Sequence, residues 1–244
     1  MKYVVLIPTY NNHSTICDVV SRTIAMVIDV VVVNDGSTDD TLLRLEKLQK
    51  EKPFTIVSHG TNKGKGCALK TGFAKALEMG YTHVVTIDAD GQHFPEDIPS
   101  LLRAGERFPE AIIVGSRSFG DDNMPEGNVF ANKFSNFWFT VQTLQRLPDT
   151  QTGFRLYPLK HVGGLRVLTS RYEAELEMLV FSAWQGTKLI PVPVRVYYPV
   201  QEERVTHFRP RMDFVRISIL NTVLCILAIV YGGPRMLFNA LIKH

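Results

Sequence analysis

The first half of the chain alternates short apolar runs with longer amphipathic stretches. Near-continuous Val and Ile runs predict strands at 2–7, 29–34, 54–58, 83–87 and 111–116. The stretches between them predict helices at 13–27, 39–50, 65–79 and 96–107. Continuous apolar runs are typical of strands covered on both faces, as in a parallel sheet. The alternation therefore predicts a doubly wound α/β fold, with a mostly parallel central sheet and helices on both faces.

The second half has a different pattern. It predicts an aromatic-rich helix at 128–146, a turn into a strand at "DTQTGFRLYP", a helix at 172–185 and a strand at "KLIPVPVRVYY". An apolar stretch follows at 217–231, and its 15 residues fall short of the roughly 20 that cross a bilayer. Arg235 comes after it, behind a Gly-Gly-Pro break. This stretch predicts a helix on a membrane surface or a truncated anchor. A helix packed on the core or in a dimer interface is the alternative.

Composition narrows the function classes. The 244 residues fit one large domain or one domain with an appendage, and a net charge of +3 gives no indication of nucleic-acid binding. Three widely spaced cysteines match neither a metal site nor a disulfide framework, so we expect a reducing compartment. The N-terminal "MKYVVLIPTY" is read as a first strand, because Pro8 interrupts its apolar run too early for a signal peptide.

Polar, glycine-containing segments follow four of the predicted strands: "PTYNN", "NDGSTDD", "DADGQH" and "GSRSF". Ligands of such sheets bind at the carboxyl ends of the strands, so these segments predict one composite site. Asp88 and Asp90 are two residues apart and would face the same side of an extended strand. Two adjacent carboxylates repel each other unless a cation lies between them, and divalent cations prefer such oxygen ligands. A polar turn is the alternative.

The glycine-rich "GTNKGKG" at 60–66 fits neither a Walker loop nor the dinucleotide fingerprint. A nucleotide could still bind by other contacts. Asp35 could accept hydrogen bonds from a base or ribose, Lys65 could meet a phosphate, and Asp90 could meet a metal-bridged diphosphate. A divalent ion in that position stabilises the negative charge of a leaving nucleotide.

Six motifs carry a family resemblance: "PTYNN", "VVNDGSTDDT", "NKGKGCALKTGF", "DADGQH", "GSR" and "DTQTGFRLYP". They stand in the order found in family-two glycosyltransferases, and residues 3–210 resemble dolichol-phosphate mannosyltransferase and bacterial polyprenyl-phosphate glycosyltransferases. The resemblance implies a GT-A fold, which is Rossmann-like, with a catalytic domain at 1–211 and a C-terminal apolar helical segment at 212–244. It also implies an inverting enzyme with a nucleotide-diphosphate-sugar donor and Mg²⁺ or Mn²⁺.

The resemblance assigns a role to each matching residue. The metal ligands are Asp88, Asp90 and Gln92, and the nucleotide-sugar contacts are Pro8, Tyr10, Asn12, Asp35, Lys65 and Asp88. Catalytic roles go to Asp90, Arg117, Asp149 and Glu177, and contacts to an acceptor phosphate go to Arg117, Arg155, Arg204 and Arg209. Two features depart from the pattern. Asn12 replaces a frequent Glu, which leaves the donor base open, and 128–146 has only Lys133 where relatives often have several Arg.

The acceptor is the main alternative that the sequence leaves open. An ionised phosphate needs only positioning, by Arg117 and Arg204, whereas a hydroxyl needs a general base. Asp149 or a glutamate at 173–177 could be that base, but Asp149 could instead be a cap or pair with Arg155. Glu173, Glu175 and Glu177 cannot all share one helix face, so at most one or two of them can point into the site. Glu177 matches the family best, and at least one of the other two is expected to be solvated.

From Arg195 to the end, the chain has seven Lys or Arg and three acidic residues, and the apolar tail lies in the same region. This favours a lipid-linked acceptor, polyprenyl phosphate, and a cytoplasmic protein that is peripheral on the cytoplasmic face of the membrane. The rival functions are transfer to a hydroxyl of a saccharide or glycolipid and, less favoured, a nucleotidyltransferase or nucleotide-sugar binding module. A homodimer is compatible with a membrane-bound C-terminal helix and with a C-terminal helix packed against protein.

Overall fold

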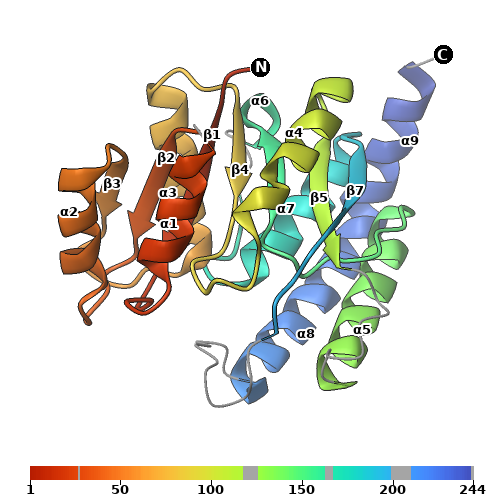
Figure 1. The fold of residues 1–244 in the computed structure, drawn as a ribbon. Coiled ribbons are helices and arrows are strands. Elements are labelled where there is room, and N and C mark those ends of the chain that lie inside the picture. Colours follow the sequence, from red (N-terminus) through yellow and green to blue (C-terminus); the bar gives the residue numbers. More distant parts are fainter. Residues whose placement is uncertain (27, 118–125, 163–166, 199–209, 243–244) are drawn as a thin grey trace.

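The computed structural model describes residues 1–26, 28–117, 126–162, 167–198 and 210–242 (Figure 1). Its centre is a seven-stranded sheet with the order β3-β2-β1-β4-β6-β5-β7, in which β6 is antiparallel to both neighbours and the other pairings are parallel. The strands are β1 Tyr3–Thr9, β2 Val30–Asn34, β3 Thr55–Ser58, β4 His83–Thr86, β5 Ile112–Arg117, β6 Arg155–Pro158 and β7 Leu189–Val194. The five strands expected in the first half and the two expected later are confirmed.

Continuous apolar strands form here because both faces of the sheet are covered. Along β1, Val4 and Leu6 belong to one hydrophobic cluster, while Val5 and Ile7 belong to the other. Alternate side chains of a strand point to opposite faces, so a strand between two helical layers must be apolar at every position. The two clusters are the core of the molecule.

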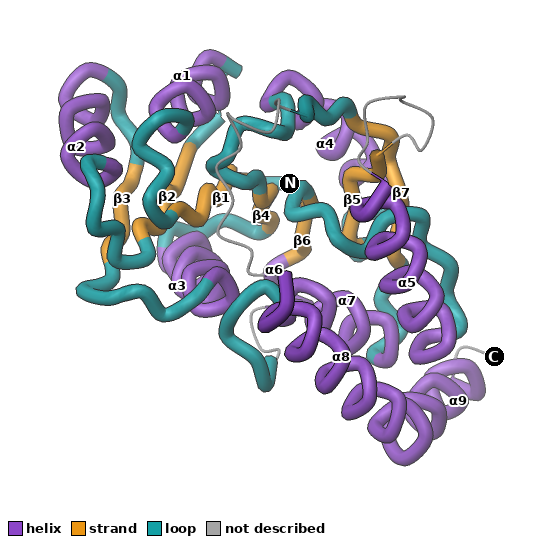
Figure 2. The backbone as a smooth tube through the Cα atoms, turned by 90° about the horizontal axis from the view of Figure 1, so that it is seen from below, coloured by secondary structure: helices purple, strands orange, loops and turns teal. Residues whose placement is uncertain are grey.

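The helices form a layer on each face of the sheet, as Figure 2 shows. One layer holds α1 Ile16–Ala25, α2 Thr41–Glu51 and α4 Ile98–Arg107, which follows a 3₁₀ turn at Pro95–Asp97. The other holds α3 Lys65–Glu78, the short α6 Leu159–Val162 and α7 Glu173–Trp184. The helices expected from the sequence are therefore present, with ends within a few residues of the expected ones.

A further group of helices lies outside α7 and is called here the outer helical layer. It consists of α5 Glu126–Thr143, α8 Pro210–Leu227, a π-helical turn at Ala228–Gly232 and α9 Gly233–Ile242. α8 packs against both α5 and α7, and Leu220 and Leu224 are buried in the same cluster as α3 and α7. The segment predicted at 212–244 thus shares a hydrophobic core with the helices that cover the sheet.

The break that was expected at Gly-Gly-Pro, after the apolar stretch 217–231, is wrong. Helical backbone continues from Pro210 to Ile242, and the π turn contains Val230, whose carbonyl Pro234 has no N–H to bond. Among the described residues, one helical stretch, Val215–Ile242, is long and apolar enough to cross a membrane, with a mean hydropathy of 2.0. That property concerns length and composition alone.

Candidate active site

The loops after β1 and β2 are bonded to each other at the carboxyl edge of the sheet. The Asn11 backbone N–H donates to Ser37 Oγ (3.0 Å), and Thr38 N–H donates to Asn11 Oδ1 (2.8 Å). Asn12 Oδ1 accepts from Thr9 Oγ1 and from the Tyr10 N–H, both at 3.2 Å, and Asn12 is only 7% exposed. Asn12 therefore shapes the loop around Pro8 and Tyr10, which lie at the end of β1.

Asp35 follows β2 directly and fixes the segment that begins α3. Its carboxylate accepts from the Lys63 N–H (2.9 Å) and the Gly64 N–H (2.7 Å). His59 Nδ1 donates to the same carboxylate (2.6 Å), and His59 Nε2 lies 2.9 Å from Thr71 Oγ1. A carboxylate has about four acceptor positions, so one remains for a ligand. His59 was not predicted, although its place just after β3 is a signal that could have found it.

The glycines of "NKGKG" permit a close approach between two segments. Gly64 has a φ of +95°, and a Cβ there would come 2.5 Å from the carbonyl oxygen of Ser170. A Cβ on Gly66 would come 2.5 Å from the Ala174 Cβ. The glycines are thus required by packing, because they let the start of α7 lie against the start of α3.

Lys65 is bonded to two carboxylates at this contact. Its Nζ lies 2.6 Å from Asp88 Oδ1 and 2.7 Å from Glu175 Oε2. Burial alone would lower the pKa of Lys65, but the two negative charges raise it well above its usual range. Burial likewise acts to raise the pKa of Asp88, yet the charge of Lys65 holds it below its ordinary value. The charged pair is therefore the stable state.

Asp90 faces Asp88 across a turn. β4 ends at Thr86, so the two aspartates do not share an extended strand, and the Gln92 N–H donates to Asp90 Oδ1 (3.0 Å). Burial, and then the negative charge of Asp88, raises the pKa of Asp90 to about 6. The expected placement of both carboxylates on one side of a strand is therefore wrong, although the two charges are close enough to interact.

These residues fit a divalent cation that arrives with a nucleotide. Within the described ranges no three His, Cys, Asp or Glu side chains gather as a metal cage. Mg²⁺ is commonly held by one or two carboxylates together with substrate phosphates. Asp88, Asp90 and Gln92 could supply the protein ligands of such a site, and the nucleotide would supply the phosphates. A Cβ on Gly153 would come 2.4 Å from Asp88 Oδ2, so this glycine makes room for the carboxylate.

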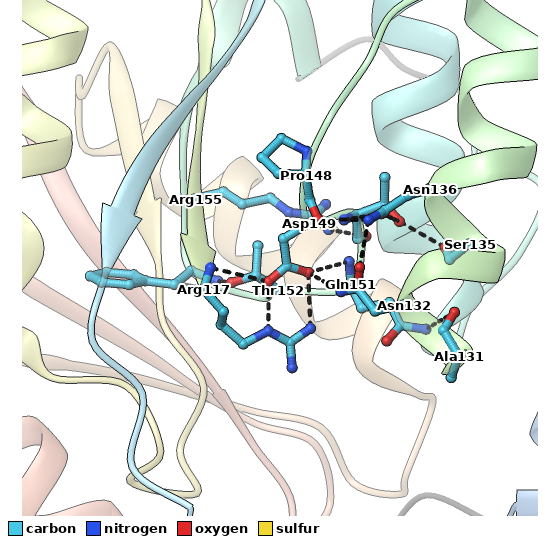
Figure 3. A network of polar contacts seen from close by, with 12 residues as sticks. Arg117, Ala131, Asn132, Ser135, Asn136, Pro148, Asp149, Gln151, Thr152 and Arg155 are labelled. Atoms are coloured by element: carbon cyan, nitrogen blue, oxygen red, sulfur yellow. Dashed lines mark hydrogen bonds and ion pairs between the residues drawn. The ribbon is translucent and has the colours of Figure 1, made fainter. Parts of the chain in front are cut away.

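Asp149 and Arg117 form a second charged pair at the end of β5 (Figure 3). Arg117 Nε donates to Asp149 Oδ2 (2.5 Å) and Arg117 Nη2 donates to Oδ1 (2.9 Å), which is a bidentate contact. Asn132 Nδ2 and the Gln151 N–H donate to Oδ1 as well (2.7 and 3.1 Å). Asp149 is 0% exposed, and although burial opposes it, Arg117 lowers the pKa of this carboxyl.

Asn132, one of the residues that hold Asp149, lies on α5 and is itself held by Asn136 of the same helix. Asn136 Nδ2 donates to Asn132 Oδ1 (2.5 Å) and to the Pro148 carbonyl (2.6 Å), and Asn136 Oδ1 accepts from the Thr150 N–H (3.0 Å). Neither asparagine was predicted. Their i, i+4 spacing, which places both on one face of α5, is the signal that could have found them.

Arg155 requires a correction. The structure places it in the interior with 0% exposure, where its guanidinium donates to the carbonyls of Thr150 (3.0 Å) and Glu175 (2.8 Å) and to the Tyr157 hydroxyl (2.9 Å). It is therefore not presented to an acceptor phosphate. The alternative in which Asp149 pairs with Arg155 is also wrong, because the partner of Asp149 is Arg117.

The three glutamates of α7 differ in their contacts. Glu177 is 0% exposed, accepts from the Leu168 N–H, and accepts from the N–H and hydroxyl of Thr169 at 2.9 and 2.7 Å. Glu175 contacts Lys65. Glu173 is one helical turn before Glu177 and so shares its side of α7 rather than that of Glu175. The solvated interpretation fails for all three, because each is buried. Arg204 and Arg209 lie outside the described residues.

Known proteins resemble the chain in sequence and in fold. Residues 4–162 match the model of glycosyl transferase family 2. A UDP-N-acetylglucosamine–dolichyl-phosphate N-acetylglucosaminyltransferase of Methanococcus voltae is 29% identical over 79% of this chain and 84% of its own length. An undecaprenyl-phosphate mannosyltransferase of Micrococcus luteus is 30% identical over 80% of this chain and 83% of its own length.

Among solved structures, glucosyl-3-phosphoglycerate synthase from Mycobacterium tuberculosis in complex with UDP is similar in fold. Its TM-score is 0.64 at 18% identity, covering 93% of this chain and 79% of that one. This likeness confirms the expected GT-A fold. The family match covers most of the strands in the sheet, and the strand-end motifs of the family meet at one edge of that sheet. The chain is therefore a glycosyltransferase that belongs to glycosyl transferase family 2.

Proposed function

We propose that this enzyme transfers a sugar, with inversion, from a nucleotide-diphosphate-sugar to a polyprenyl phosphate. Relatives whose names state lipid-phosphate acceptors match about four fifths of the chain, which supports this substrate class. The observation that carries the proposal is that Asp149, Glu175 and Glu177, three of the four carboxylates that could serve as a base for a hydroxyl acceptor, are already bonded to other groups. A hydroxyl needs a general base, whereas a phosphate oxygen is already ionised near neutral pH.

Three of the four candidate bases are bonded to other protein groups, whereas the fourth, Glu173, is buried with one carboxyl oxygen that has no hydrogen-bond partner in the described structure. Asp149 is enclosed and holds Arg117 bidentately, Glu177 holds the backbone at 168–169, and Glu175 holds Lys65. A carboxylate whose pKa is lowered by an arginine is a poor proton acceptor. This arrangement disfavours transfer to a hydroxyl and supports an acceptor that needs positioning only.

Arg117 is the proposed positioning group for the acceptor. Its fork is oriented by Asp149, and its side chain is still 15% exposed. An arginine fixed in this way can direct its remaining N–H donors at a phosphate oxygen. The acceptor oxygen would then attack the anomeric carbon from the face opposite the leaving diphosphate. Arg204 and Arg209 stay predicted contacts to the same phosphate.

On the donor side, we propose that Asp35, with Pro8 and Tyr10, lines the nucleoside, and that Asp88, Asp90 and Gln92 hold Mg²⁺ or Mn²⁺. When bound, the cation would stabilise the negative charge of the departing nucleoside diphosphate. The solved mycobacterial synthase, crystallised with UDP and Mn²⁺ and also with UDP and Mg²⁺, supports this choice of ions.

The outer helical layer is the proposed membrane contact. Each of its helices exposes large apolar side chains where the structure describes them: Phe137, Val141, Val215, Ile219, Val223, Ile226, Ile229, Val230, Tyr231, Leu237, Phe238, Leu241 and Ile242. An apolar face of this extent is unusual on a soluble monomer and suits a bilayer that also carries the lipid acceptor. Because Leu220 and Leu224 are buried in the protein, we propose that the layer lies along the membrane surface.

A donor-release assay tests the function. The full chain, with Mn²⁺ or Mg²⁺, would be offered UDP-, GDP- and dTDP-sugars with and without polyprenyl phosphate. We expect nucleoside diphosphate release that requires both metal and lipid phosphate and is lost in Asp90→Asn. Release that is equal without the lipid but rises with a saccharide would favour a hydroxyl acceptor. Pyrophosphate release would indicate a nucleotidyltransferase.

A further inference from the structure

Lys65 binds one carboxylate that belongs to the proposed metal site and one that does not. Asp88 is a proposed metal ligand, whereas Glu175 lies on α7, on the other side of the ammonium. The side chain of Lys65 is 15% exposed and that of Glu175 is 9% exposed, so both charges are largely removed from water. An ammonium in such surroundings requires a partner at all times, because an unpaired buried charge is costly.

Glu175 is held in place by several contacts. The Arg155 guanidinium donates to its backbone carbonyl (2.8 Å), and Ala174, the residue before it, packs against Gly66 beside Lys65. The Cys67 N–H donates to the Ser170 carbonyl (3.2 Å), which ties the start of α3 to the segment that leads into α7. The buried Arg155 thus fixes the backbone of α7 at Glu175.

We propose that Glu175 is a positioning residue that retains Lys65 when a divalent cation and the donor diphosphate take over Asp88. The inference rests on the proposed metal site. A cation and the Lys65 ammonium compete for the same carboxylate, and without Glu175 the ammonium could release Asp88 only by becoming an unpaired buried charge. With Glu175 it keeps one partner and stays at the start of α3, where a diphosphate would meet the amino end of a helix.

The test is Mn²⁺ binding to the full chain, measured by electron paramagnetic resonance with and without UDP or GDP. In Glu175→Gln the ammonium has only Asp88, so we expect the Kd for Mn²⁺ to rise about tenfold, the size of one coupled charge pair. Glu175→Asp should lie between this variant and the wild type. Glu173→Gln removes the same charge from the same helical turn and is the matched control, with a change below about twofold expected.

A double-mutant cycle separates positioning from simple attraction. Lys65→Gln removes the competitor and should lower the Kd for Mn²⁺. In the Lys65→Gln background, Glu175→Gln should then change the Kd by less than about twofold. A full effect of Glu175→Gln in that background, or an equal effect of Glu173→Gln, would overturn the proposal, because Glu175 would then act by its charge alone.

The outcomes distinguish a failure of the role proposed for Glu175 from a failure of the proposed metal site. Wild-type protein that binds Mn²⁺ in an Asp90-dependent way, but shows no coupling in the cycle, contradicts only the role of Glu175. Wild-type protein that binds no Mn²⁺, with or without nucleotide, contradicts the metal site and the inference with it. Thermal unfolding of each variant shows whether a changed Kd comes from a folded protein.

Discussion

At the scale of single residues, the site depends on charged groups that hold one another. Arg117 and Asp149 were each expected in the site, and the structure joins them in a bidentate pair. Lys65 and Asp88 were likewise expected near the donor, and the structure adds Glu175 as the second partner of the lysine. The site therefore depends on the side chains that orient Arg117 and Lys65 as well as on those proposed to touch the substrate.

Replacing Arg117 by Lys tests the value of the fork. Lysine keeps the charge but cannot donate two parallel hydrogen bonds to Asp149, so its position is no longer fixed. We expect kcat/KM for polyprenyl phosphate to fall at least about tenfold, with donor affinity unchanged. Arg195→Lys is the matched control, because Arg195 makes an exposed bidentate contact with Asp97. An unaltered acceptor KM in the Arg117 variant would argue against the positioning role.

His93 gives a prediction about pH. It is 6% exposed, and burial lowers its pKa to about 4 from an ordinary 6.5. The unfolded chain therefore binds this proton more tightly than the folded one, so the contribution to stability is full above pH 6.5 and is lost as the pH falls towards 4.

We expect wild-type protein to lose roughly 2 kcal/mol more unfolding free energy between pH 6.5 and 4.5 than His93→Gln does. Urea unfolding at each pH measures the difference, with the exposed His13→Gln as control. Identical pH slopes for wild type and the His93 variant would show that folding does not lower the pKa of this histidine.

At the scale of elements, the start of α7 and the outer helical layer are set by close contacts that involve glycine. Gly64 and Gly66 bring α7 to α3, and Gly232 brings the π turn to Trp184. Trp184 is fully buried, and its indole Nε1 donates to the Gln142 carbonyl of α5 (2.7 Å). One indole thus joins α5, α7 and the helices that follow.

Gly232→Ala should loosen this junction. The added Cβ would come 2.4 Å from the indole Cε2, and the buried ring has no room to yield. We expect a loss of about 1–3 kcal/mol of unfolding free energy, as for overpacked cores. Gly233→Ala is the neighbouring control, since its Cβ would come no nearer than 3.1 Å to the Ala228 carbonyl and alanine favours the helix. Equal stability of the Gly232 variant would mean that α8 and α9 do not depend on Trp184.

At the scale of the whole molecule, two surfaces have opposite chemistry. The carboxyl edge of the sheet gathers the charged groups, and the outer helical layer exposes many large apolar side chains. Figures 1 and 2 show where this edge and these helices lie. An enzyme for a polar donor and a lipid acceptor needs both surfaces on one body. Their combination in 244 residues is consistent with the proposed substrates.

Vesicle binding tests the apolar face. Ile219 and Ile226 are both 58% exposed and lie on one side of α8, so replacing both by Ser removes apolar area without touching the core. We expect co-sedimentation with phosphatidylcholine vesicles to weaken at least about tenfold, since each isoleucine contributes on the order of 1–2 kcal/mol. Leu43→Ser is the control, an exposed leucine on α2.

The thermal midpoint of the double variant should equal that of wild type. A wild-type protein that ignores vesicles, but forms a dimer which the double variant cannot form, would assign this face to an interface between two copies.

Local patterns predicted the elements well, because strand and helix formation depend on residues near one another in the chain. The Val and Ile runs, the amphipathic periods and the strand-end loops were sufficient for the sheet, its two covered faces and the edge that carries the site. They also placed Asp88, Asp90 and Lys65 in that region, whereas Arg117 and Asp149 were assigned to it by the family resemblance.

What the sequence alone could not determine is which of those residues meet. The exclusion of Arg155 from the acceptor side, the pairing of Asp149 with Arg117 and the place of Glu175 beside Lys65 depend on the packing of β6 and α7, far along the chain. The same holds for the tail, whose apolar composition was evident. Its continuous helix and inward face depend on contacts with Trp184 and Gln142. Composition fixes how apolar a segment is, whereas its partners are selected by tertiary packing.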